Sequence, residues 1–489
     1  MKSENNLLFN SVVLVLYCSL IIFGIQHHEL WGDEIHSWNI VKGSHTLPEL
    51  FKNIRYEGHP PLWYLILFPI TQFSHALIYL KAVQLVFCLG TAVLILFFSP
   101  FSKIQKVLVL CGYYFVFEYA VLARNYMPAV FIALCIAAIH PRQFKYKTNC
   151  YYFLLFLLSN VHLLGLLLAM SIHAGYCYEL FRGKHRILNP VIAGMLVFLP
   201  AVYFILPPAD SQLNFGFWVD QWSVSRLYLF VTVILKSMLP MPEISNPHWW
   251  NTNYLLDNDG LISRGLSVLI FIFLLFSIYL AARKSKTAFV ILFTNLSLTF
   301  LLSLFFPLNT SRYVGFAFVG FMVAAWFSFF SDRPFNKNIF ILLLLLQVPA
   351  GIFAVVKDYR AKFSSAETVV AMRNEIPQSA FVATDYWCLN NLAAYLDTPV
   401  YCLELKRPVS FLIWNSEMKD IIHYDYVAGL EALLNLNGNL PFYFFSIHNE
   451  TELLGNESPA IKMNVKLIGY SGDAIEKSGR VFLYLVERL

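Results

Sequence analysis

The chain has 489 residues, of which 58% are apolar, 17% are aromatic and only 13% are charged. Soluble globular domains carry roughly twice that charged fraction, so the composition excludes an ordinary soluble enzyme and indicates a polytopic membrane protein. The net charge of +5 does not point to nucleic-acid binding, because Lys and Arg in the loops of a membrane protein serve to set its topology.

The first apolar run, residues 7–25, is long enough to span a bilayer and is not followed by a small-residue cleavage site. It is therefore interpreted as a retained helix. Further apolar runs of spanning length alternate with loops that are either basic or nearly uncharged. If the basic loops all face the cytoplasm, eleven spans follow. They are 7–25, 78–98, 107–122, 125–140, 150–164, 165–181, 190–206, 261–282, 287–306, 313–330 and 338–356.

Two apolar segments, 61–73 and 227–240, do not fit as crossings. Counting either as a span would place the later basic loops on the wrong side, so both are interpreted as helices lying at or dipping into the outer interface. The expected transmembrane domain covers residues 1–356.

Residues 357–489 have the composition of a soluble domain, with short amphipathic helices and strand-like runs such as "AFVAT", "LPFYFFSI" and "RVFLYLVE". We expect a small outward-facing α/β domain there. Its two cysteines, Cys388 and Cys402, could pair in an oxidising compartment or stay free.

The ionisable residues that are unusual for a membrane protein gather on the predicted outer side. They are Asp33, Glu34, Glu57 and His59 in the first outer loop, Glu118 and Arg124 around the turn after the third span, His162 near the outer end of the fifth, and Arg312 at the start of the tenth. A charge close to hydrocarbon is costly unless it is paired or faces water, so this grouping predicts a shared polar cavity.

Each feature also has a purely structural interpretation. The acidic residues could be solvated loop residues, the arginines could contact lipid phosphates, and His162 could pack between helices. Glu29 is typical of a solvated helix end, and Trp249 and Trp250 are typical of an aromatic belt. The combination favours chemistry: a carboxylate can act as a general base on a hydroxyl, and arginines can hold a phosphate leaving group.

Five motifs in order resemble bacterial glycosyltransferase family 39-like proteins, which belong to the C-type membrane glycosyltransferases. The motifs are "WGDEIHSW", "EGHPPLWYLIL", "EYAVLARNYMPAVF", "SNVHLLGLLLA" and "TSRYVGFAFVGF". Related groups are the protein O-mannosyltransferases and the aminoarabinose transferases that modify lipid A. The resemblance implies inverting transfer of a sugar from a polyprenyl phosphate to an acceptor on a lipid, protein or polysaccharide, in the bacterial cytoplasmic membrane with the site facing outward.

The resemblance also implies roles for single residues. Asp33 would be the catalytic base, and Glu34 would shape the site or help to bind the acceptor. The donor phosphate would be bound by Arg124, Arg312, Tyr126 and Tyr313. The cavity would be lined by Glu57, His59, Pro60, Pro61, Glu118 and His162.

No nucleotide is implied, and a divalent cation at the two adjacent carboxylates is left open. The main rival function is a transporter or flippase for a lipid or lipid-linked sugar, which predicts ionisable residues near mid-membrane.

Overall fold

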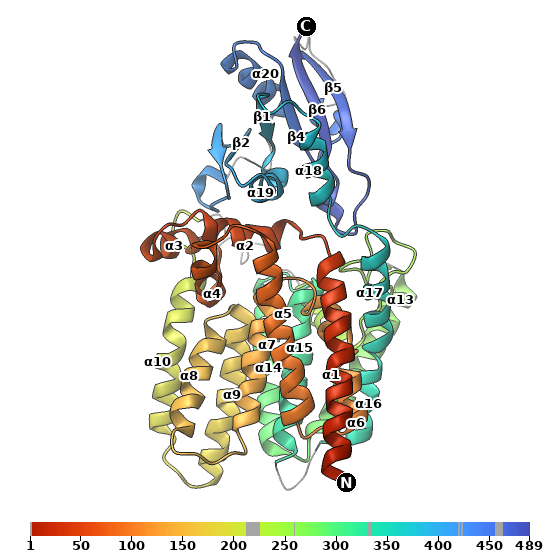
Figure 1. Ribbon diagram of the computed structural model, residues 1–489. Coiled ribbons are helices and arrows are strands. Elements are labelled where there is room, and N and C mark those ends of the chain that lie inside the picture. The colour runs from red at the N-terminus through yellow and green to blue at the C-terminus, as the bar shows by residue number, and fades with distance from the viewer. Residues whose placement is uncertain are drawn as a thin grey trace.

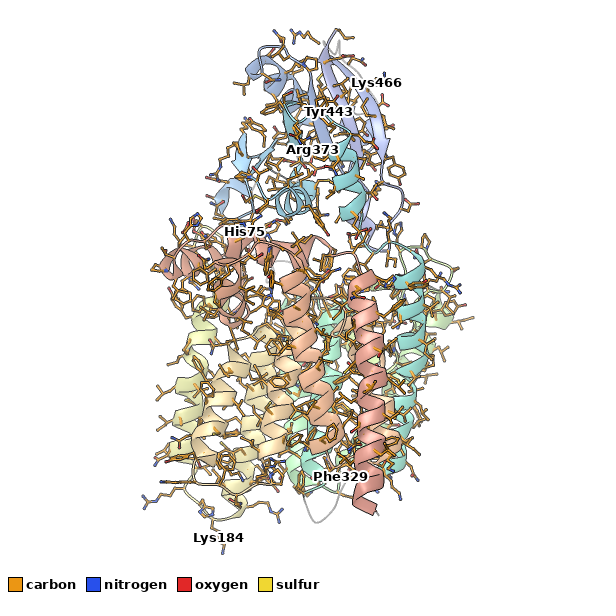
Figure 2. The ribbon with its side chains drawn as sticks, viewed as in Figure 1. His75, Lys184, Phe329, Arg373, Tyr443 and Lys466 are labelled. Carbon is orange, nitrogen blue, oxygen red and sulfur yellow. The ribbon has the colours of Figure 1, made fainter. Side chains whose placement is uncertain are left out.

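The computed structural model describes residues 2–211, 225–258, 260–330, 335–418, 421, 424–454 and 463–489. A bundle of helices forms one part of the molecule, and a smaller unit built around a β-sheet stands on one end of it (Figure 1). We call this end of the bundle the domain end and the opposite one the free end. The N-terminal helix starts at the free end, where Lys184 of a basic loop also lies (Figure 2).

Eight helical segments among the described residues are long and apolar enough to cross a membrane, and they match eight of the eleven predicted spans. They lie in α1 (Lys2–His27), α5 with its π-helical end (Ile78–Val93 and Leu94–Phe98), α9 (Leu163–Arg182), α10 (Leu188–Ile205), α13 (Leu261–Ala282), α14 (Lys286–Phe305), α15 (Ser311–Ser328), and α16 with α17 (Lys337–Leu345 and Val348–Arg360).

The other three predicted spans are shorter helices. They are α6 (Lys103–Leu110) with the π-helical turn η2 (Tyr114–Glu118), α7 (Tyr126–Ile139) and α8 (Lys147–Ser159). A helix of 14 residues, such as α7, is about 21 Å long and does not cover the roughly 30 Å of hydrocarbon. The connection 119–125 before α7 is not helical, and all of its residues are buried. Its backbone is thus enclosed by protein, as a membrane requires.

The segment between α1 and α5 is largely helical. It contains α2 (Gly32–Lys42), α3 (Leu47–Ile54) and α4 (Leu62–Thr71), which lie at the domain end of the bundle (Figure 1). The second segment expected at the interface is α12 (Ser225–Met238). It packs against α13, α14 and α15, and residues 231–238 are buried. These helices therefore enclose α12 over residues 231–238.

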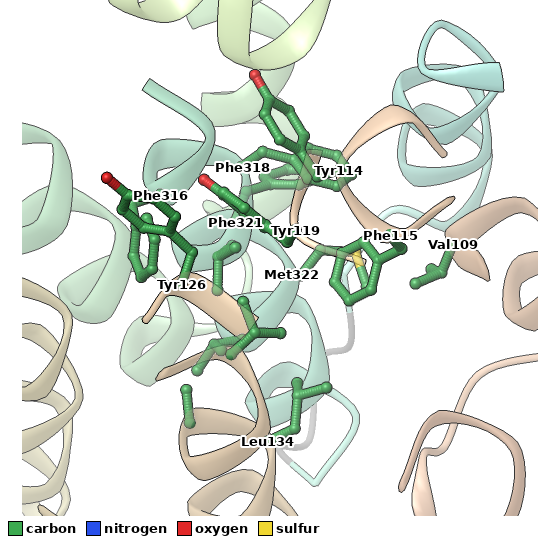
Figure 3. Close-up of a cluster of buried hydrophobic side chains, with 14 of the residues drawn as sticks. Val109, Tyr114, Phe115, Tyr119, Tyr126, Leu134, Phe316, Phe318, Phe321 and Met322 are labelled. Carbon is green, nitrogen blue, oxygen red and sulfur yellow. The ribbon is translucent and has the colours of Figure 1, made fainter. Parts of the chain in front are cut away.

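The bundle core is aromatic where α15 meets the segment that runs from η2 to α7. Tyr114 stacks on Phe318 with ring centroids 5.7 Å apart, and Tyr119 lies 5.6 Å from Phe316 (Figure 3). A Cβ at Gly315 would collide with both tyrosine side chains. Glycine therefore lets η2 approach the start of α15, which fixes these two parts of the chain relative to each other.

The C-terminal unit is a six-stranded mixed sheet with strand order β3-β2-β1-β4-β6-β5. Strands β2, β1 and β4 are parallel, and β3, β6 and β5 are antiparallel to their neighbours. The strands are β1 (Val382–Thr384), β2 (Val400–Cys402), β3 (Arg407–Val409), β4 (Phe442–Ser446), β5 (Met463–Tyr470) and β6 (Phe482–Arg488). The helices are α18 (Ala366–Asn374), α19 (Tyr386–Tyr395), α20 (Tyr426–Leu436) and α21 (Glu450–Leu454).

The expected α/β fold of this region is therefore present. Buried apolar side chains from the sheet and the helices form its core. Cys388 and Cys402, for which pairing was left open, are both buried and free.

Helix α2 lies between the bundle and the sheet unit, against α19 (Figure 1). The amide of Asn39 donates to the carbonyl of Asn390 at 2.9 Å, and the ammonium of Lys42 donates to the carbonyl of Ala393 at 3.1 Å. Helix α2, which begins with the Asp-Glu pair, therefore lies against the bundle on one side and is hydrogen-bonded to the sheet unit on the other.

Candidate active site

The structure brings Asp33, Arg124 and Arg312 together at the domain end of the bundle. Asp33 lies in the first turn of α2, Arg124 in the connection before α7, and Arg312 in the first turn of α15. One oxygen of Asp33, Oδ2, lies 3.5 Å from Arg124 Nη1 and 3.2 Å from Arg312 Nη2. The Asp33 side chain is 42% exposed, whereas those of Arg124 and Arg312 are 9% and 14% exposed. A single accessible carboxylate thus faces two largely buried guanidinium groups.

The two arginines control the ionisation of Asp33. Burial alone would raise the pKa of its carboxyl group, but the charges of Arg312 and then Arg124 outweigh burial and hold the pKa below its ordinary value. Asp33 is therefore ionised at neutral pH.

Arg312 is surrounded by aromatic rings. Its guanidinium carbon lies 4.9 Å from the ring centroid of Trp31, 5.7 Å from that of Trp250 and 5.1 Å from that of Tyr313. Its Nε and Nη1 atoms are buried and have no hydrogen-bond partner. The interpretation of Trp249 and Trp250 as an interfacial belt is wrong, because both are buried and Trp250 lies against the arginine.

Glu34 is buried and accepts hydrogen bonds from within the protein. Its Oε2 accepts from the backbone N–H of Trp31 at 3.0 Å, and its Oε1 accepts from that of Ala123 at 2.5 Å. Because Ala123 precedes Arg124, Glu34 fixes the connection that carries this arginine to the start of α2. The two roles that the resemblance implied, shaping the site or helping to bind the acceptor, stay predictions.

His28 and Asp358 complete the group behind Glu34. His28 Nε2 lies 3.1 Å from Glu34 Oε2, and its Nδ1 lies 3.1 Å from Asp358 Oδ1. Burial alone would lower the pKa of His28, but the carboxylates of Asp358 and Glu34 outweigh it and raise the pKa to about 10. Sequence reasoning missed this pair because Asp358 lies 330 positions away, at the end of α17.

Glu29 and Glu57 each pair with a basic side chain. Glu29 is buried, and it pairs with Lys362 at 3.4 Å, so its interpretation as a solvated residue is wrong. Glu57 accepts from His36 Nε2 at 3.1 Å, and His36 Nδ1 lies 3.2 Å from Asn390 Oδ1 of the sheet unit. Glu57 is thus connected to the sheet unit through His36, and its expected role in lining the cavity stays a prediction.

The segment after Glu57 leads back into the bundle. Pro60 is buried, Pro61 precedes α4, and the N–H of Leu62 donates to the carbonyl of Asn160 at 2.9 Å. His59 lies beside the cluster formed by Asp33 and the arginines. Burial and the charge of Arg124 lower the pKa of His59 to about 4, and its Nδ1 is buried without a partner.

His162 and Tyr126 lie next to each other, with ring centroids 5.2 Å apart, and the Tyr126 ring lies 6.4 Å from that of Tyr313. His162 caps α9, because its Nδ1 accepts from the N–H of Gly165 at 3.0 Å. Its Nε2 and the hydroxyl of Tyr126 are buried without partners.

Glu118 lies behind the cluster. It accepts from the hydroxyl of Tyr113 at 2.6 Å and from the indole N–H of Trp250 at 3.0 Å. It therefore supports the ring that packs against Arg312. Its other oxygen, Oε1, is buried without a partner, and the expected role in lining the cavity stays a prediction.

The residues at the site do not offer a set of ligands for a cation. Asp33 faces two arginines, and both oxygens of Glu34 accept from N–H groups of the protein. Within the described ranges, no group of three or more His, Cys, Asp or Glu side chains could hold a metal ion.

No family model matches the sequence, and no curated protein matches it. Two crystal structures of ArnT from Cupriavidus metallidurans match the fold, one bound to undecaprenyl phosphate and one in the apo state. Each comparison covers 99% of this chain and 98% of ArnT, with a TM-score of 0.55 and 11% sequence identity. At this level of identity the likeness concerns the fold. The polytopic fold with a C-terminal domain, expected from composition and hydropathy, is confirmed.

Proposed function

We propose that the protein is a membrane glycosyltransferase that moves a sugar from a polyprenyl phosphate to an acceptor hydroxyl group. The fold that it shares with ArnT over the full chain, together with undecaprenyl phosphate as the lipid bound by that protein, supports this class of donor. The observation that carries the proposal is the convergence of Arg124 and Arg312 on Asp33.

The donor phosphate would be held by the two arginines. Guanidinium groups are forked donors that stay charged and match phosphate oxygens in geometry. The Nε and Nη1 atoms of Arg312 are buried N–H donors without partners, so a phosphate would satisfy them. Tyr126 and Tyr313 lie beside Arg312 and would bind along the edge of the same phosphate.

The reaction would be a single displacement with inversion. Asp33 takes the proton of the acceptor hydroxyl, the oxygen attacks the anomeric carbon, and the bond from this carbon to the phosphate oxygen breaks. Arg124 and Arg312 stabilise the charge that the polyprenyl phosphate carries away. When the phosphate engages the arginines, its negative charge raises the pKa of Asp33, which makes this carboxylate a better base.

We place the protein in the bacterial cytoplasmic membrane, with residues 1–356 as the transmembrane domain and the domain end facing outward. The basic loop that contains Lys184 lies at the free end, in agreement with a cytoplasmic position (Figure 2). A transporter or flippase would instead place ionisable residues near the middle of the bundle. The cluster around Asp33 lies at the end of the bundle, which favours transfer over transport.

Substitution of Asp33 by Asn tests the role of the base. We expect the variant to fold and to bind undecaprenyl phosphate, but to lose sugar transfer, because an amide cannot take the proton. Transfer is followed by mass spectrometry of the envelope glycans and glycoproteins of cells that carry either form. Full transfer by Asp33→Asn would remove the carboxylate from the mechanism.

A further inference from the structure

The turn before α9 gathers three polar side chains next to Arg124. The N–H of Leu62 donates to the carbonyl of Asn160, and the amide of Asn125 donates to the carbonyl of Val161 at 3.4 Å. Both the start of α4 and the start of α7 are thus tied to this turn. Consequently His59, Tyr126 and His162, each within three positions of one of these contacts, lie in one region.

All three side chains carry a buried polar atom without a partner. Because Nδ1 of His162 accepts from Gly165, the neutral ring carries its proton on Nε2, which makes Nε2 a donor. This donor, the hydroxyl of Tyr126 and Nδ1 of His59 are all buried and unpartnered. His162 and Tyr126 are each only 2% exposed. Native proteins rarely leave such atoms unsatisfied, so a polar ligand is expected to complete them.

The charges in this region disfavour a cationic ligand. Burial, followed by the charge of Arg124, lowers the pKa of His59 to about 4. Burial, followed by His59 and Arg124, lowers the pKa of His162. The same field would repel an ammonium group. The nearby carboxylates already have partners, since Asp33 faces the arginines and Glu57 accepts from His36. Uncharged hydroxyl groups can accept from the His162 and Tyr126 donors at no such cost.

On the basis of the proposed function, we propose that His162, His59 and Tyr126 form the sugar-binding part of the donor site. The geometry points to a donor that carries a neutral sugar, recognised through its hydroxyl groups, and not an amino sugar. Tyr126 lies between His162 and Tyr313 and would mark the boundary between the sugar and the phosphate.

The test measures binding to the full-length protein in lipid nanodiscs with three probes. They are undecaprenyl phosphate alone, undecaprenyl phosphate linked to glucose, and undecaprenyl phosphate linked to 4-aminoarabinose. We expect the glucose-linked lipid to bind more tightly than undecaprenyl phosphate, and the aminoarabinose-linked lipid to bind no more tightly than it. Tighter binding of the amino sugar donor than of the glucose donor would overturn the proposal.

The variant His162→Asn tests the unpartnered Nε2–H group of His162. An Asn side chain can still cap α9 by accepting from Gly165, but it does not reach the position of Nε2. We expect about fivefold weaker binding of the glucose-linked lipid, corresponding to one hydrogen bond, and unchanged binding of undecaprenyl phosphate.

Tyr151→Phe is the matched control, because it removes a buried side-chain hydrogen bond, here to His173, from the packing of α8 and α9. It should leave binding of all three probes unchanged.

If His162→Asn and the wild type bind the glucose-linked lipid equally well, the proposed sugar site is overturned. The proposed phosphate site is not affected by this result. If the wild type binds none of the three probes, the proposed function itself fails. The two failures are therefore distinguishable.

Discussion

At the scale of single residues, the site depends on mutual support between opposite charges. Arg124 and Arg312 keep Asp33 ionised, and Asp33 keeps two largely buried guanidinium groups paired in the absence of a phosphate. An unpaired buried charge is costly, so this pairing preserves the arrangement on which the proposed phosphate site depends. Glu34, one position further along the chain, differs from Asp33 because its carboxylate accepts hydrogen bonds from backbone N–H groups of the protein.

Replacement of Glu34 by Gln should destabilise the protein. One carboxylate oxygen becomes an NH₂ group that faces N–H donors, and the lost hydrogen bonds should cost about 1–3 kcal/mol. Thermal unfolding of the purified protein measures the effect.

The control for Glu34 is Glu49→Gln. Glu49 accepts from the N–H of His45 at 2.8 Å, but this contact is exposed to solvent. We expect a clearly smaller change in melting temperature for Glu49→Gln. Equal changes in the two variants would contradict the structural role of Glu34.

At the scale of elements, α2 is the centre of the site. It carries Asp33 and Glu34 in its first turn, contacts α19 along its length, and is connected through His28 to Asp358 at the end of α17. The sequence predicts the acidic pair and the helical spans, because both are local patterns. It does not predict the contact of His28 with Asp358, because such a contact depends on how distant helices pack.

The His28 contacts predict a dependence of stability on pH. His28 has a folded-state pKa of about 10, above its ordinary value of about 6.5. The stabilisation is therefore fully present below about pH 6.5 and is lost as the pH rises through about 10. We expect the melting temperature of the wild type to fall between pH 7 and pH 10, and the decrease to be smaller in His28→Gln.

His27→Gln is the matched control for this experiment. His27 is the neighbouring histidine, and it is exposed and lies 2.9 Å from the carbonyl of Phe23. It should keep the slope of the wild type. If His28→Gln and His27→Gln had the same slope as the wild type, the charge on His28 would not contribute to stability.

At the scale of the whole molecule, the arrangement of charged residues predicts the orientation in the membrane. Leu436 in α20 of the sheet unit is 75% exposed, and Arg186 lies exposed in the basic loop next to Lys184. A cysteine introduced as Leu436→Cys should react with a membrane-impermeant maleimide on intact cells. A cysteine introduced as Arg186→Cys should react only after the cells are permeabilised. Labelling of Arg186→Cys but not of Leu436→Cys on intact cells would contradict an outward-facing site. So would labelling of Leu436→Cys no stronger than that of the protein without the introduced cysteine.

The fold of both parts was largely predictable because hydropathy and alternation are strong local signals. Eight predicted spans and strands such as β6 (Phe482–Arg488), predicted from "RVFLYLVE", match the structure. The roles of Trp31 and Trp250 were not predictable, since burial against Arg312 cannot be distinguished in sequence from an aromatic belt. Likewise, the alternation of basic loops, which argued against α12 as a crossing, could not show that α12 packs against α13, α14 and α15.

Binding of undecaprenyl phosphate to the purified protein tests most directly whether the two arginines hold the donor. We expect Arg124→Ala and Arg312→Ala each to weaken binding at least about tenfold, because each removes charged donors to the phosphate. Arg407→Ala, at an exposed pair with Glu417 in the sheet unit, should leave it unchanged. Wild-type affinity in both Arg124→Ala and Arg312→Ala would contradict the phosphate site and, with it, the proposed transferase.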